Sequence, residues 1–224
     1  IKKRLIRVMR MHAGDRLEVA TPQQRWECQL HQVLPDGIIL KKLSDLPSPH
    51  QNRVRLILGQ AIPKGDRFEW LIQKATELGV SEIHPLITER TIVRPEKSTT
   101  KVQRWNEIAA AAAEQSESDQ PSIILPPEPL NIFLKKAPDG LKLLLHERQG
   151  AASLKELLAG GNYYNSNIIF IVGPEGGWTK AETELIVSAG FHKVHLGSRI
   201  LRSETAGLVL AAIIEYETTE KQNE

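Results

Sequence analysis

A glycine-rich turn is the part of this sequence best suited to bind a small ligand. Residues 173–180 read GPEGGWTK and directly follow the apolar run 167–172, which is typical of a buried strand. Glycines lack side chains, so backbone amides in such a turn can approach a ligand closely. Open α/β sheets bind ligands at the carboxyl ends of their strands. Three glycines and one proline within five residues exceed the needs of a simple strand-to-helix turn, so the pattern favours a binding site.

A second segment has the same setting, between a short predicted strand and a predicted helix. Residues 196–207 read LGSRILRSETAG. Ser203 is a candidate N-cap of the following helix, whose first N–H groups have no partner within the helix. Arg202 and Glu204 add charge at the same place. Each residue alone could be a cap or a surface charge, and it is the pairing of the two segments that favours a functional site.

Neither segment matches a common nucleotide-binding fingerprint. The sequence contains no Gly-x-x-x-x-Gly-Lys-Ser/Thr run, which a P-loop requires, and no Gly-x-Gly-x-x-Gly run, which marks a dinucleotide-binding turn. The single cysteine, Cys28, excludes an intramolecular disulfide and a cysteine-based zinc site, and no metal centre is predicted. A reducing cytoplasm is therefore the expected location.

Length and hydropathy indicate a globular protein of one or two domains. The 224 residues suffice for one medium and one small domain, and the apolar share of 41% is that of a globular protein. The apolar runs are too short to cross a bilayer and no charged-then-apolar leader is present, so no membrane attachment is predicted. Residue 1 is Ile rather than Met, so we expect the chain to lack its true start and the N-terminal domain to be incomplete.

Charge is distributed unevenly along the chain. Residues 1–55 contain eleven Lys and Arg against five Asp and Glu, a net charge of +6, although the whole chain carries only +2. The remaining residues therefore carry a net charge of −4. A basic segment attached to a mildly acidic body indicates a polyanion partner such as nucleic acid. The alternative is a solvated surface that happens to be basic.

Two different patterns divide the chain. Up to residue 47 the sequence predicts short strands and turns, as in a small β-barrel or sheet, and residues 46–50 are typical of a linker. Beyond the linker, predicted strands alternate with predicted helices, which is typical of an α/β domain with a mostly parallel sheet. The predicted strands are 16–19, 26–33, 38–40, 54–59, 83–87, 141–145, 167–172 and 194–196, and the predicted helices are 64–78, 101–117, 153–158, 179–189 and 205–216. The charged end, 215–224, is expected to fray.

The two turns and several further motifs resemble the signature of the RsmE family, the 16S ribosomal RNA uridine-N3 methyltransferases of the SPOUT superfamily. The likeness extends over nearly the whole chain. Besides the two turns, the similar motifs are RVMRM at 7–11, EWLIQKATELGV at 69–80, TER at 88–90, AAEQS at 112–116 and HE at 146–147. One departure is the stretch 117–119, which reads ESD where family members often carry an arginine.

The resemblance implies a fold and an activity. The implied fold class is α/β: a SPOUT-type α/β knot with a mostly parallel sheet and a C-terminal trefoil knot over residues 48–224, and a small PUA-like RNA-binding β-barrel over residues 1–47. The implied reaction is methyl transfer from S-adenosyl-L-methionine to N3 of a uridine in the decoding region of 16S rRNA. The implied partners are small-subunit ribosomal RNA or the assembled 30S subunit, and a second copy of the chain, because SPOUT enzymes are usually homodimers.

The resemblance also implies roles for individual residues. Backbone groups within 196–201 would hold the cofactor adenine, and the glycines of 173–177 would line its methionine side. Arg202 is expected to stabilise charge on the uridine, with Glu175 or Glu204 as the base, although either glutamate could instead hold a loop in place. The predicted cofactor-binding residues are Leu145, His146, Gly173, Glu175, Gly176, Gly177, Leu196, Gly197, Ile200, Leu201, Arg202, Thr205 and Ala206, and the predicted RNA contacts are Arg4, Arg7, Arg10 and Arg90.

The residues leave two alternative functions open. One is a ribose 2′-O RNA methyltransferase of the same superfamily, whose last motif normally carries a Ser-Leu-Asn-type sequence where this chain reads RSETA at 202–206. The other is a non-catalytic RNA-binding ribosome-assembly factor. Such a factor would be expected to have a damaged cofactor loop, whereas 173–177 reads as intact.

Overall fold

The chain divides into two compact units, Ile1–Gln51 and Asn52–Glu224, each described here by itself from a computed structural model. The structure describes residues 2, 4–20, 24–46, 54–91, 99–118, 120–146, 150–158 and 166–219. The expected domain boundary after residue 47 and most of the expected linker lie outside the described residues. Residue 46 still belongs to the last strand of the first unit.

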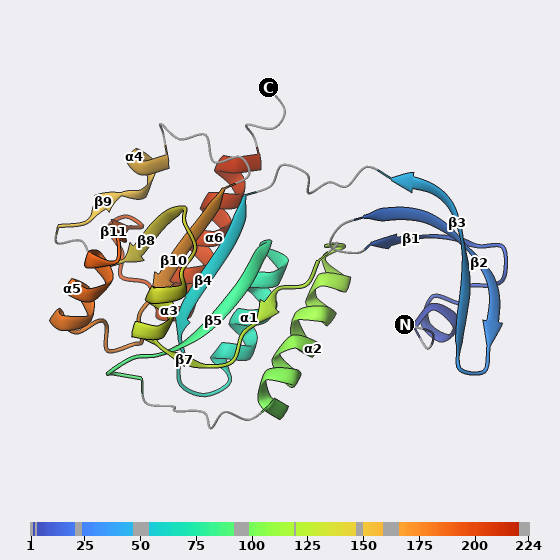
Figure 1. Cartoon of the computed structure of the whole chain (residues 1–224), viewed down its shortest axis with the longest axis horizontal. Coiled ribbons are helices and arrows are strands. Elements are labelled where there is room, and N and C mark those ends of the chain that lie inside the picture. Colours follow the sequence, from blue (N-terminus) through green and yellow to red (C-terminus); the bar gives the residue numbers. More distant parts are fainter. Residues whose placement is uncertain are drawn as a thin grey trace. The chain divides into compact units, whose positions relative to one another are not determined.

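The first unit contains a three-stranded antiparallel sheet in the order β1-β2-β3 (Figure 1). Its strands are β1 (Arg16–Ala20), β2 (Arg25–Leu34) and β3 (Gly37–Leu46), preceded by one π-helical turn, η1 (Arg4–Val8). The predicted strands of this region are confirmed, and β3 extends well beyond the predicted 38–40. Cys28 and Leu30 of β2 are buried together with Leu5, so one face of the small sheet carries the apolar side chains.

The second unit is built on an eight-stranded sheet in which every pairing is parallel (Figure 1). The strand order is β6-β5-β4-β10-β8-β11-β9, and β7 pairs with β5. The strands are β4 (Arg55–Ala61), β5 (Val80–Ile87), β6 (Ile123–Ile124), β7 (Glu128–Pro129), β8 (Leu141–Leu145), β9 (Ala152–Ser153), β10 (Asn167–Val172) and β11 (His192–His195). The prediction of an α/β unit with a mostly parallel sheet is therefore confirmed.

Six helices accompany the sheet within the described residues. They are α1 (Arg67–Glu77), α2 (Thr99–Gln115), α3 (Leu130–Lys136), α4 (Leu154–Leu158), α5 (Lys180–Ser188) and α6 (Ser203–Thr219). Thr179 caps α5 as predicted, with a reciprocal pair of hydrogen bonds to Glu182. The expectation that the chain frays from residue 215 is wrong as far as Thr219, because α6 continues to that residue. Neither these helices nor any other described helix has both the length and the apolar character that crossing a membrane requires.

Two apolar clusters cover the two faces of the parallel sheet. Alternate residues of β10 point to opposite faces, as in any strand. Phe170 belongs to the cluster that includes residues of α1, α2 and α6, and Ile169 and Ile171 belong to the cluster that includes residues of α3 and α5. This alternation explains why the run 167–172 is apolar at nearly every position. The result is a three-layer unit with β10 at its centre (Figure 1).

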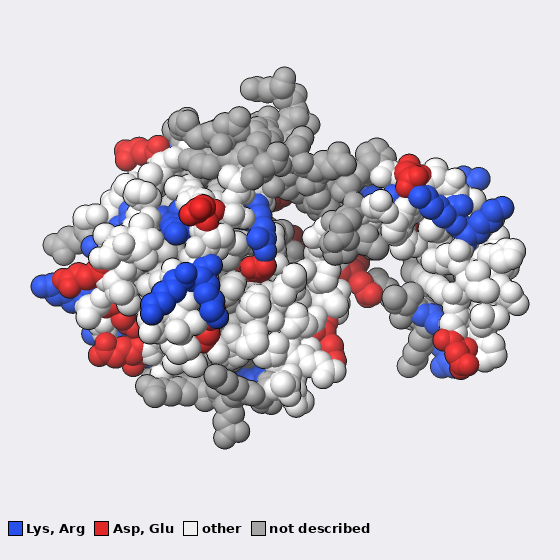
Figure 2. Space-filling view, viewed as in Figure 1, with Lys and Arg blue, Asp and Glu red and all other residues white. Residues whose placement is uncertain are grey.

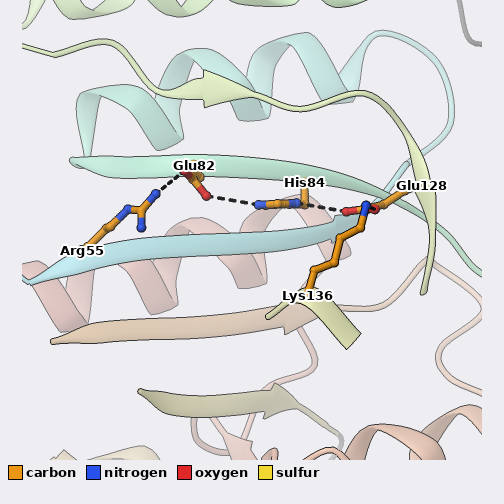
Figure 3. A network of polar contacts seen from close by, with 5 residues as sticks. All are labelled: Arg55, Glu82, His84, Glu128 and Lys136. Atoms are coloured by element: carbon orange, nitrogen blue, oxygen red, sulfur yellow. Dashed lines mark hydrogen bonds and ion pairs between the residues drawn. The ribbon is translucent and has the colours of Figure 1, made fainter. Parts of the chain in front are cut away.

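A network of polar side chains connects β5 to neighbouring elements (Figure 3). His84 lies between two carboxylates, with Nδ1 3.3 Å from Glu128 Oε1 and Nε2 3.3 Å from Glu82 Oε2. Arg55 of β4 pairs with Glu82, and Lys136 of α3 lies 3.1 Å from Glu128 Oε2. These contacts connect β4, β7 and α3 to β5, so the network has a structural role at the β5 edge.

Candidate functional site

Three loops of the second unit start from the same edge of the sheet. β10, β8 and β11 are adjacent and parallel, so their last residues, Val172, Leu145 and His195, lie at the same edge. The glycine-rich turn follows β10, and the segment 196–202 follows β11. The two segments that the sequence singles out are therefore neighbours, although Val172 and His195 are 23 positions apart in the sequence.

A hydrogen bond joins the glycine-rich turn to the first residue of α6, which directly follows the segment 196–202. The Ser203 hydroxyl donates to the Gly173 carbonyl and accepts a bond from Gln60 Nε2 at 2.8 Å. The prediction that Ser203 is the N-cap of the last helix is wrong, because Ser203 is its first helical residue. Its side chain reaches across to the glycine-rich turn instead of turning back onto its own helix.

Trp178 links the glycine-rich turn to the loop after β8. Its Nε1 donates to the Leu145 carbonyl at 3.3 Å, and its ring packs against Gly173. A Cβ at position 173 would lie 3.0 Å from the ring, so only glycine leaves the ring in place. This role of Trp178 was not predicted from the sequence, although its position at the end of the turn, one residue before the helix cap Thr179, could have suggested it.

Two glycines of these loops border open space. Gly177 and Gly197 have φ values of +69° and +106°, which L residues with side chains rarely adopt, and a Cβ at either position would meet nothing within 4 Å. The main-chain groups of residues 198–201 make no hydrogen bond to other described residues. Both turns thus present backbone that a ligand could contact.

The two candidate carboxylates have different surroundings. Glu175 Oε1 accepts a hydrogen bond from the Lys64 backbone N–H at 3.1 Å and lies 3.5 Å from Arg67 Nη1. Glu204 is buried, its side chain 7% exposed, with Oε1 3.8 Å from Arg67 Nε. Its other oxygen, Oε2, is buried and has no hydrogen-bond partner among the described residues. Glu175 therefore ties its loop to α1, while Glu204 keeps one acceptor atom uncommitted.

The cationic residues of the predicted site also differ in their partners. Arg202 and Arg199 are exposed, and neither forms an ion pair within the described part of the chain. Arg90, predicted to contact RNA, donates from Nη1 to the Gly176 carbonyl at 2.5 Å. A Cβ at Gly176 would lie 3.2 Å from the Arg90 side chain. Arg90 therefore lies against the glycine-rich turn.

The remaining predicted residues fall into three groups. Leu145, Leu196 and Leu201 are half-buried against the main apolar cluster, and Ala206 is buried within it. Ile200 is 81% exposed, Thr205 is half-buried, and the His146 N–H donates to the Val194 carbonyl. Arg7 and Arg10 belong to the first unit and are exposed; the side chain of Arg4 and the residues Glu147 and Asp119 lie outside the description.

Sequence reasoning missed three residues between the end of β4 and the start of α1 that contact these loops, one buried and two exposed. Gln60, Lys64 and Arg67 all come from a single stretch at the end of β4 and the start of α1. A glutamine inside an otherwise apolar strand is the signal that could have identified the first of them. Nowhere in the described ranges do three or more His, Cys, Asp or Glu side chains gather in a way that could hold a metal ion.

Comparison with known proteins identifies the family. Residues 50–215 match the family model described as RNA methyltransferase domain. Ribosomal RNA small subunit methyltransferase E from a Synechocystis strain is 36% identical over 217 residues, which cover 94% of this chain and 69% of that protein. The protein of the same name from Bacillus subtilis is 31% identical, over 96% of this chain and 86% of its own length. The chain belongs to the RsmE family.

A solved structure agrees with this assignment. Ribosomal RNA small subunit methyltransferase E from Neisseria gonorrhoeae, determined bound to S-adenosyl methionine, is similar with a TM-score of 0.81 and 32% identity, covering 95% of this chain and 87% of that chain. The RsmE resemblance inferred from the motifs is thus confirmed.

Proposed function

We propose that this chain transfers the methyl group of S-adenosylmethionine to N3 of a decoding-region uridine in 16S ribosomal RNA. The observation that carries the proposal is the hydrogen bond from Ser203 to Gly173, which brings together the two turns expected to hold the cofactor. Membership of the RsmE family supports both the cofactor and the class of RNA.

Three features of the chain fit S-adenosylmethionine. The left-handed glycines 177 and 197 border open space, where a Cβ would meet no atom within 4 Å. Main-chain groups of 198–201 are available to pair with the edge of an adenine. Leu145, Leu196 and Leu201 add apolar surface beside them. We assign the cofactor to the full set predicted from the sequence, with Gly173, Gly176 and Gly177 toward its methionine end.

The finer features of the fold belong to the same proposal. We propose that the loops after β8, β10 and β11 form a trefoil knot, a rare exception to unknotted topology. The three-stranded sheet of the first unit is proposed to be part of a PUA-like barrel over residues 1–47, with the methyltransferase domain over 48–224 and the chain acting as a homodimer on small-subunit rRNA or the 30S subunit. Antiparallel pairing in the order β1-β2-β3 is compatible with such a barrel.

The chemistry assigns separate tasks to Arg202 and Glu204. The bound cofactor supplies a methyl group already activated for displacement. Uridine N3 carries a proton at neutral pH, so the chain must accept that proton and stabilise the charge that spreads to O2 and O4. Arg202 is free to stabilise that charge, and Glu204, with one unpaired carboxylate oxygen, is favoured over Glu175 as the acceptor. The residues also align N3 with the methyl carbon, a contribution worth up to roughly 7–11 kcal/mol.

Exchanging each glutamate for glutamine distinguishes the two candidate bases. Glu204→Gln is expected to lower the single-turnover rate about 100-fold, the usual range for a lost general base. Glu175→Gln is expected to lower it less than about fivefold, since it weakens the partly exposed ion pair with Arg67 while an amide oxygen can still accept the Lys64 N–H. Raising the pH until the uridine loses its own proton should restore the Glu204→Gln rate. A larger loss for Glu175→Gln, or no recovery at high pH, would contradict this assignment.

The first unit is proposed to hold RNA through Arg7 and Arg10. It contains nine Lys and Arg against five Asp and Glu, so two of the eleven cations counted over 1–55 belong to the second unit, and the first unit carries +4. Figure 2 shows acidic side chains interspersed among its basic ones. Arg16 pairs with Glu27, and Lys42 with Asp45, whereas Arg7 and Arg10 are exposed without an ion-pair partner among the described residues.

The variant Arg7→Ala/Arg10→Ala is therefore expected to weaken RNA binding while leaving cofactor affinity unchanged. Each lost phosphate contact should reduce the salt dependence of RNA affinity, lowering the slope of log K against log salt by about 0.7–0.9. The matched control Arg16→Ala/Lys42→Ala removes the same charge from residues that are already paired. Filter binding across a salt series measures the RNA affinity and its salt dependence for both double variants. Equal losses in the two double variants would show that only net charge matters.

Methylation of hypomethylated small subunits tests the proposed function itself. The protein is incubated with S-adenosylmethionine and 30S subunits from a strain lacking the modification, and the product is mapped by mass spectrometry. A methyl group on uracil N3 is expected. A methyl group on a ribose O2′ would indicate the first alternative, and absence of cofactor binding at millimolar concentration would indicate a non-catalytic RNA-binding protein.

A further inference from the structure

A buried glutamine lies beneath the two turns of the proposed cofactor site. Gln60 is at the carboxyl end of β4 and is 0% exposed. Its Nε2 donates to Ser203 Oγ at 2.8 Å and to the Ala61 carbonyl at 3.0 Å. Its Oε1 is buried and has no partner among the described residues. A buried polar side chain with an unsatisfied oxygen costs free energy, so its presence requires an explanation beyond packing.

The hydrogen bonds of Gln60 have a fixed direction. Both hydrogens of its amide are used, one for Ala61 and one for Ser203. The single hydroxyl hydrogen of Ser203 is then directed to the Gly173 carbonyl. Turning the amide over would set Oε1 against the Ala61 carbonyl, and the Ser203 hydroxyl would then have to donate to Gln60 in place of Gly173. We call this series of bonds, from the Gln60 amide to the Ser203 hydroxyl to the Gly173 carbonyl, the relay. It holds the end of β4, the start of α6 and the glycine-rich turn in one arrangement.

The space beside the amide is preserved by a glycine. A Cβ at Gly207, in the first turns of α6, would lie 3.0 Å from Gln60 Oε1. That distance is tighter than most real Cβ contacts, so a side chain there would require the amide to shift. The N-terminal part of α6 is thus shaped to admit the glutamine and to place Ser203 against it.

We propose that Gln60 is a positioning residue that sets the separation of the two cofactor-binding turns, acting through Ser203 on the carbonyl of Gly173. This inference rests on the proposed function. It explains why the buried end of a central strand carries an amide whose oxygen has no partner among the described residues: one N–H begins the relay at Ser203 and the other holds the amide to the Ala61 carbonyl. Gln60 itself touches neither turn's open face, so its effect is on the geometry of the cofactor site.

Cofactor affinity in a double-mutant cycle tests the inference. The variants are Gln60→Met, which keeps the approximate volume, Ser203→Ala and the double variant, each measured by calorimetry with S-adenosylmethionine. Each single variant is expected to raise Kd about tenfold, and the double variant to raise it no further, because either change interrupts the same relay. Losses that add up in the double variant would overturn the proposal.

A control variant separates positioning from general stability. Thr76→Val removes a buried hydroxyl that lies 2.8 Å from Ser122 Oγ and has no contact with either turn. It is expected to lower the melting temperature about as much as Gln60→Met, while Kd stays within about twofold of the unsubstituted protein. Failure of the unsubstituted protein to bind the cofactor would count against the proposed function, whereas an unchanged Kd in Gln60→Met alone would overturn the role of Gln60.

Discussion

Arg202→Ala is expected to lower kcat about 100-fold, with Kd for S-adenosylmethionine changed less than about threefold. Arg202 is exposed immediately before α6, next to Ser203, and makes no ion pair with any described residue. Its guanidinium is therefore available to a substrate. A donor that meets charge only as the uridine loses its proton contributes to the transition state and little to binding of the cofactor. Rapid-quench kinetics and calorimetry give the two quantities separately.

Arg199 provides the matched control for that experiment. It belongs to the same segment, is exposed and also has no ion-pair partner in the described part of the chain, so Arg199→Ala removes the same charge three residues away. We expect its kcat to stay within about threefold of the unsubstituted enzyme. Equal losses of kcat and cofactor affinity in Arg202→Ala, or an equal fall of kcat in both variants, would remove the catalytic role of Arg202.

Phe170→Ala is expected to lower the free energy of unfolding of the second unit by about 3–5 kcal/mol. Phe170 is 0% exposed in the central strand β10, between Leu58 of β4 and Leu143 of β8 in register. Its ring belongs to the apolar cluster that this face of the sheet shares with α1, α2 and α6. Removing the ring loses the free energy of burying it. It also leaves a cavity, because β10 is paired with β4 on one side and β8 on the other and cannot easily move to fill it. Urea titration followed by circular dichroism measures the loss.

Two further variants calibrate this expectation. Phe170→Leu keeps most of the apolar volume and is expected to lose less than half as much free energy. Val187→Ala, on α5 where the side chain is 43% exposed, is expected to change the free energy of unfolding by no more than about 0.5 kcal/mol. A loss below about 1 kcal/mol for Phe170→Ala would mean that the layers can close around the gap.

β10 contributes to this core and leads directly into the glycine-rich turn at Gly173. Packing of the core and geometry of the proposed cofactor site therefore depend on the same strand. The strand is held between β4 and β8, so the position of its last residue is determined by the core. The relay through Gln60 and Ser203 then locates the second turn relative to the first. Loss of packing around Phe170 is therefore expected to weaken cofactor binding as well.

Local sequence patterns predict several strands and helices and the two turns of the candidate site. The apolar run 167–172 followed by glycines predicts a buried strand and an exposed turn, because burial on both faces of a strand demands apolar residues at successive positions. Thr179 and Glu182 predict the start of α5 for an equally local reason, since a cap involves residues only three apart. The pairing of the turns at 173–177 and 196–202 also follows from the alternation of strands and helices, which sends parallel strand ends to one edge.

Other features depend on contacts between distant residues, and no local pattern encodes them. Ser203 reads as a cap in sequence, yet its hydroxyl bonds to Gln60, 143 residues away, and to Gly173. Arg67 reads as a surface charge, yet it lies between Glu175 and Glu204. The packing of whole layers decides the order of the strands, and therefore which side chains meet at the end of β10. The chemistry available to each residue is local, whereas its partner is chosen by the tertiary fold.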